Sequence, residues 1–228
     1  MKTVLSYLMF ILPALILSIY AQIKVKSTFK RYSQVRSSRG MSGVDVASTI
    51  LRRNGMSGQV VVEPVAGELS DHYDPTTHKV RLSETVYGSN SIAAIGVAAH
   101  EVGHAIQHHE SYGPLELRHR IVPVTNFASG ASFPVLLLGF FLNSLDLIMV
   151  GILLFSAVVV FHLVTLPVEL NASRRAVAQL SSSGIISGSE VPMVKKVLGA
   201  AALTYLAATL SSIATLLYYL MIFAGGDE

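Results

Sequence analysis

The stretch LIMVGILLFSAVVVFHLVTL, residues 147–166, contains twenty consecutive residues without a charged side chain. At a rise of about 1.5 Å per residue, a helix of this length matches a hydrocarbon core roughly 30 Å thick. Three more apolar stretches without charged residues lie at 4–23, 121–142 and 200–223. We therefore predict a mainly α-helical integral membrane protein with about four transmembrane helices.

The composition supports a membrane protein and excludes several other classes. Of the 228 residues, 51% are apolar and only 14% are charged, whereas about a quarter of the residues of a soluble domain are charged. The absence of cysteine excludes disulfide frameworks, thiolate zinc fingers and cysteine nucleophiles. The net charge of +3 does not indicate a nucleic-acid partner, because the basic residues border apolar segments and form no nucleic-acid-binding motif.

The distribution of lysine and arginine orients the predicted spans. Twelve of these residues lie between 24 and 120, four lie between 167 and 199, and one, Lys2, precedes the first span. The turn at 143–146 and the C-terminal tail contain none. Under the positive-inside rule the N-terminus lies outside, and both basic segments face the cytoplasm. A cleaved signal peptide is the alternative for 4–23, but its apolar core is usually only about 7–15 residues long.

From these spans we expect five segments. They are an N-terminal transmembrane anchor (1–23), a cytoplasmic segment with a candidate catalytic helix (24–120), a transmembrane hairpin (121–166), a second cytoplasmic segment (167–199) and a C-terminal transmembrane helix with its tail (200–228). The first cytoplasmic segment has the pattern of a small α+β unit. We expect in it a helix over 44–55, strands at 59–63 and in KVRLS ending at 83, and a turn-rich connection between the strands.

The next helix, capped by Ser89, Asn90 or Ser91, contains AAHEVGHAIQHHE at 98–110. In this stretch His100, Glu101 and His104 form the pattern HExxH. Residues i and i+4 of a helix lie on one face, so both imidazoles can bind one Zn²⁺ ion. The adjacent carboxylate can act as the general base that takes a proton from the attacking water. The pattern predicts metal-assisted peptide hydrolysis; the alternative is a histidine-rich helix that only binds the membrane surface.

Catalytic zinc usually has a third protein ligand. His108 lies two turns from His100, about 12 Å along a straight helix, which is too far to share one ion. The remaining strong candidate is Glu169 in VELNASRRA, because the predicted topology places it on the same side of the membrane. Ser173, one turn later, can support a metal-binding imidazole. The alternative for this glutamate is an ion pair with one of the two arginines that follow it.

Several stretches together resemble a known family. They are LSDHYDPTTHKVRLSETVYGSNSIAAIGVAAHEVGHAIQHHESYGPLELR, the N-terminal anchor and the later ELNASRRA. In these the chain resembles the YugP family of neutral zinc metallopeptidases of bacterial membranes, and the order HExxH, two spans, ExxA is also similar to the HtpX and CAAX prenyl protease families. The resemblance implies an α+β zincin-like catalytic unit of the gluzincin type. It also implies one Zn²⁺ per chain, held by His100, His104 and Glu169, with Glu101 as the base; Ser173 stands where HtpX-like proteins usually have Asp.

We therefore expect a zinc metalloendopeptidase in the bacterial plasma membrane, with its catalytic site facing the cytoplasm. Its substrates would be polypeptides, among them membrane or membrane-proximal proteins, and its surroundings the lipid bilayer and unidentified regulatory partners. KVRLS is the expected edge strand on which an extended substrate pairs. A non-enzymatic zinc-binding membrane scaffold is the alternative, although a structural site would not need the carboxylate of Glu101.

Overall fold

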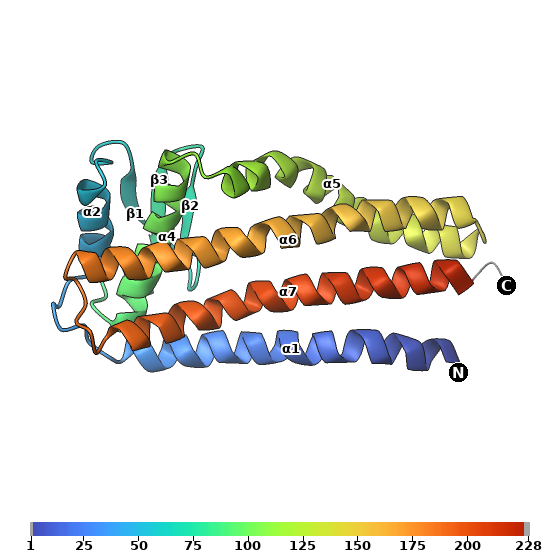
Figure 1. The fold of residues 1–228 in the computed structure, drawn as a ribbon, viewed down its shortest axis with the longest axis horizontal. Helices are drawn as coiled ribbons and strands as arrows, with labels where there is room; N and C mark the ends of the chain where they lie inside the picture. Colours follow the sequence, from blue (N-terminus) through green and yellow to red (C-terminus); the bar gives the residue numbers. More distant parts are fainter. Residues whose placement is uncertain (1, 226–228) are drawn as a thin grey trace. The chain divides into compact units, whose positions relative to one another are not determined.

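The computed structural model describes the backbone of residues 2–225 and the side chains of residues 9–225. Its elements follow one another as α1 (Lys2–Ser33), α2 (Gly43–Arg53), β1 (Val61–Val65), β2 (His72–Asp74), β3 (Lys79–Ser83), α3 (Glu84–Tyr87), α4 (Ile92–His109), α5 (Gly113–Phe141), α6 (Leu145–Ser182) and α7 (Val191–Gly225). Figure 1 shows these elements in the colours of the sequence. The protein is mainly helical, with one small sheet.

The chain divides into two compact units. One, the helical unit, contains the residues up to Gln22, Pro114–Pro167 and those from Thr204 onward. The other, the mixed unit, contains Ile23–Gly113 and Val168–Leu203. The boundaries fall inside long helices, so that α1, α6 and α7 each contribute to both units.

Among the described residues, four helices are long and apolar enough to cross a membrane, namely α1, α5, α6 and α7. The four spans predicted from the sequence fall on these helices. Within the helical unit, Ser18 Oγ of α1 lies 3.0 Å from Ser211 Oγ of α7, which is a polar contact between two otherwise apolar helix faces. Residues 226–228 of the predicted C-terminal tail lie outside the described residues.

The sheet of the mixed unit corrects two expectations. β2 forms inside the segment predicted to be only a turn-rich connection, and it pairs antiparallel with β3 through Tyr73 opposite Val80. β1 pairs parallel with the other side of β3, so the strand order is β1-β3-β2. β3, the KVRLS strand, is therefore the central strand and has no free edge. Its Leu82 is fully buried, because a central strand packs its alternate side chains into the core.

The helix α4 runs through the core of the mixed unit. Its N-cap Ser91 accepts a hydrogen bond from the Ala94 backbone N–H at 3.2 Å, the cap that Ser, Asn or Asp typically provides. Half of its buried residues are alanine or glycine, among them Ala98 and Ala105. α4 packs against α2, β2 and β3, and this packing holds the helix that carries the HExxH pattern.

Candidate metal centre

A glycine in α4 lets α6 approach closely. A Cβ atom added to Gly103 would lie 2.7 Å from the carbonyl oxygen of Ala172 in α6, which is closer than real Cβ contacts allow. Only glycine permits backbone contact of this kind. Because Ala172 lies three residues after Glu169, about one helical turn, this contact brings the carboxylate of α6 to the histidines of α4.

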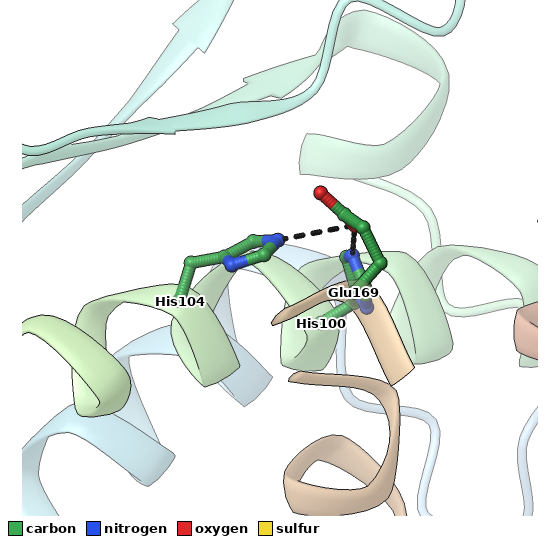
Figure 2. A group of neighbouring side chains, drawn as sticks. All are labelled: His100, His104 and Glu169. Carbon is green, nitrogen blue, oxygen red and sulfur yellow. Dashed lines mark hydrogen bonds and ion pairs between the residues drawn. The ribbon is translucent and has the colours of Figure 1, made fainter. Parts of the chain in front are cut away.

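His100, His104 and Glu169 point toward one another (Figure 2). One ligand atom from each lies within 4.8 Å of the others. The Nε2 atom of His100 is 3.3 Å and that of His104 is 3.4 Å from Glu169 Oε2. In a tetrahedral site with zinc distances of about 2.0–2.2 Å, ligand atoms lie roughly 3.4 Å from one another. The donor set and both distances from the imidazole nitrogens to the Glu169 oxygen therefore fit one zinc ion.

A chain of hydrogen bonds orients the His104 ring. Arg175 Nε, which can only donate, bonds to Asn171 Oδ1 at 2.7 Å. The same oxygen accepts from Gln107 Nε2 at 2.9 Å, which leaves Gln107 Oε1 to accept from His104 Nδ1 at 3.0 Å. Because Nδ1 carries the proton, Nε2 of a neutral ring presents its lone pair to Glu169.

Two acceptor atoms that face each other repel unless a cation lies between them. A proton on His104 Nε2 can relieve the repulsion between this nitrogen and Glu169 Oε2. A metal ion can bind all three side chains at once. His100 is held in a similar way, because its Nδ1 lies 3.2 Å from Ser173 Oγ. The arrangement thus has the features of a cation site in which a hydrogen-bond partner at Nδ1 orients each imidazole ring.

Glu101 lies beside the three converging residues and is not one of them. Its side chain is buried. Burial raises the pKa of Glu101 to about 7, the nearby carboxylates of Glu169 and Asp71 act in the same direction, and His100 and a hydrogen bond from the Tyr73 backbone oppose them. A carboxyl group with a pKa near neutrality can both accept and return a proton.

The sequence matches one family over residues 7–224, described as "Putative neutral zinc metallopeptidase". The chain belongs to this family. It is also 57% identical, over 94% of its own length and 95% of the relative's, to "Putative membrane protease YugP" of Bacillus subtilis (strain 168). No solved structure matches the chain significantly. Four apolar helices agree with the membrane location that the relative's name states.

Membership of the zinc metallopeptidase family implies zinc, and the three converging side chains are a group that fits it. His108 is not one of these three side chains. It contacts β2 instead, where its Nδ1 lies 2.8 Å from the Tyr73 hydroxyl. Arg175, one of the arginines considered as a partner of Glu169, pairs with Glu110 at 2.7 Å.

Gln107 is the residue of this candidate metallopeptidase site that sequence reasoning missed. Its side chain is fully buried, and its Nε2 also donates to the Val168 carbonyl oxygen at 2.9 Å. It thus joins α4 to α6 directly beside Glu169. The signal in the sequence was its position three residues after His104, because residues i and i+3 share a helix face.

Proposed function

We propose that the protein is a zinc-dependent endopeptidase of the gluzincin type, with one Zn²⁺ held by His100, His104 and Glu169. The supporting observation is the convergence of two imidazole nitrogens and a carboxylate oxygen, with their ligand atoms within 4.8 Å of one another. The family match adds the reaction class. When bound at these residues, zinc would polarise the scissile carbonyl group and lower the pKa of the attacking water.

Glu101 is the general base in this proposal. It follows His100 in α4 and is buried beside the converging ligand atoms. Its carboxylate takes a proton from the attacking water and returns it to the leaving amine. A buried site excludes bulk water, which strengthens each electrostatic interaction at the reacting atoms.

The free edge of β2 is our corrected position for an extended substrate. β2 lies at the end of the strand order, and the helix α4, which carries Glu101, packs against it. A polypeptide that adds to this edge would therefore lie next to the proposed base, with backbone hydrogen bonds supplying affinity. The strand is only three residues long, so it would hold a short part of the substrate.

The proposed orientation follows from the charge distribution. Residues 24–120 and 167–199 carry sixteen of the seventeen lysines and arginines and would face the cytoplasm, with both termini outside. On this assignment 1–23, 121–166 and 200–228 are the membrane segments. The proposed substrates are membrane or membrane-proximal polypeptides of a bacterial plasma membrane.

Zinc content and hydrolysis test the proposal together. Elemental analysis of the full chain in detergent should find about one zinc in the wild type and far less in Glu169→Ala and His104→Ala. Glu84→Ala, which removes an exposed carboxylate of α3, is the control and should retain zinc. Retention of zinc by Glu169→Ala would exclude this residue as a ligand.

Glu101→Gln separates binding from chemistry. The variant should keep zinc and cleave an unfolded polypeptide such as casein about 10²–10⁴-fold more slowly, because general base catalysis contributes a factor of that order. If the wild type and Glu101→Gln both held zinc and cleaved the substrate at the same rate, the role of Glu101 would be contradicted. Zinc without any cleavage by the wild type would favour the membrane scaffold.

A further inference from the structure

A cavity lined by basic side chains lies between α1 and α7 in the mixed unit. It measures about 430 Å³, and its lining includes three cations, Lys24 and Arg31 of α1 and Lys196 of α7. Lys24 and Arg31 are seven residues apart, which places them two turns apart on one helix face. The volume is in the range of sites for small ligands and headgroups, roughly 300–1,000 Å³.

No carboxylate balances these three charges within the described residues. α1 and α7 contain no Asp or Glu between Lys2 and Ser33 or between Val191 and Gly225. The nearest acid in the sequence, Glu190, accepts hydrogen bonds from the backbone and hydroxyl of Ser38 and of Ser187. Like charges around one cavity repel, so an anion that enters it is favoured.

The cavity lies where both helices change from apolar to basic. The residues of α1 before Lys24, back to residue 3, are uncharged, and those of α7 after Lys196 are uncharged to Gly225. In a membrane helix this change marks the level of the lipid headgroups. Leu203 adds an apolar wall on the membrane side of the lining.

We infer that this cavity binds the headgroup of an anionic glycerophospholipid, with the phosphate between Lys24, Arg31 and Lys196 and the glycerol end against Leu203. A lipid fits better than a free anion because the lining combines three cations with apolar residues that continue into a membrane helix. Basic pockets between membrane helices bind anionic headgroups by the same chemistry. This site does not depend on zinc or on peptidase activity.

The test is lipid retention by the full chain in detergent, measured by native mass spectrometry. The probes are phosphatidylglycerol and phosphatidylcholine with the same acyl chains. The cavity variant is Lys24→Gln/Arg31→Gln/Lys196→Gln. Its matched control changes three exposed cations of the same two helices that do not line the cavity, Lys26→Gln/Lys30→Gln/Lys195→Gln.

The wild type should retain one phosphatidylglycerol in preference to phosphatidylcholine. The cavity variant should bind it at least about tenfold more weakly, because each cation near the surface contributes roughly a fivefold attraction. The control should keep the preference. Equal losses in both triple variants would indicate general surface attraction and overturn the site, as would full retention by the cavity variant.

Gly199→Leu tests the cavity without changing its charge. A Cβ atom on Gly199 would meet no atom within 4 Å, so a larger side chain can enter the cavity that this residue lines. This variant should also lose the preference for phosphatidylglycerol while its melting temperature stays near that of the wild type. Unchanged retention would overturn the proposal, and displacement of the lipid by millimolar inorganic phosphate would identify a free-anion site instead.

Discussion

The candidate metal centre and the cationic cavity between α1 and α7 both collect charged groups in the mixed unit, but they differ in how those groups are held. At the metal centre each imidazole has a hydrogen-bond partner at its Nδ1 atom, Gln107 for His104 and Ser173 for His100. At the cavity no ion pair holds Lys24, Arg31 or Lys196 within the described residues. A prearranged site recognises geometry, whereas cations without an ion-pair partner recognise charge.

The largest effect should come from the contact that builds the metal centre. Gly103→Ala places a methyl group against the Ala172 backbone, where a Cβ atom would be 2.7 Å from the carbonyl oxygen. The helices must separate, so we expect loss of zinc binding and a loss of stability of about 1–3 kcal/mol. Elemental analysis and thermal unfolding measure the two effects.

Gly96→Ala is the matched control in the same helix. Its Cβ would lie 3.5 Å from Val194 Cγ1, which is an ordinary van der Waals contact. This variant should keep zinc and stability. If Gly103→Ala also kept both, the close approach of α4 and α6 would not be what positions Glu169.

A smaller effect is expected when only the orientation of one ligand is lost. Gln107→Leu removes the acceptor behind His104 and should lower zinc affinity about 10–100-fold, the usual cost of losing a partner of a metal ligand. Competition with a zinc chelator measures this affinity. Gln179→Leu, which removes hydrogen bonds to Asn54 instead, should leave zinc affinity unchanged; an equal loss in both variants would indicate a general effect of stability.

The smallest effect concerns Glu190, the acid directly before the first residue of α7. Burial raises the pKa of Glu190, but hydrogen bonds from Ser187 and Ser38 outweigh it and hold the pKa at about 2, below the ordinary 4.5. The ionised form is therefore favoured by folding, and its stabilisation is complete above pH 4.5 and is lost as the pH falls toward 2. Glu190→Gln should melt roughly 2–4 °C lower than the wild type at pH 7, and the gap should narrow as the pH falls below the ordinary pKa of a glutamate.

Glu84→Gln, at an exposed position, provides the comparison for this pH series. It should melt like the wild type at every pH. A gap for Glu190→Gln that stayed constant from neutral pH down to about pH 3.5 would show that folding does not lower the pKa of this carboxyl group.

The sequence predicted the local parts of the fold better than their pairing. The apolar runs fall on the four long helices, and Ser91, one of three candidate caps, begins α4. The strand β2 was missed because its three residues lie among turn-forming residues. KVRLS was expected at an edge but is central, because strand order depends on contacts between distant segments that no local pattern records.

Residue spacing alone places His100 and His104 one turn apart with Glu101 beside them, because an α-helix repeats every 3.6 residues. The sequence also named Glu169 as the third candidate ligand, but its distance from the imidazoles, the support from Gln107 and the cavity between α1 and α7 needed the tertiary structure. They join segments separated by tens of residues, and their geometry depends on how closely helices pack, as at Gly103. The sequence thus determined which chemical groups are present, and packing decided which of them meet.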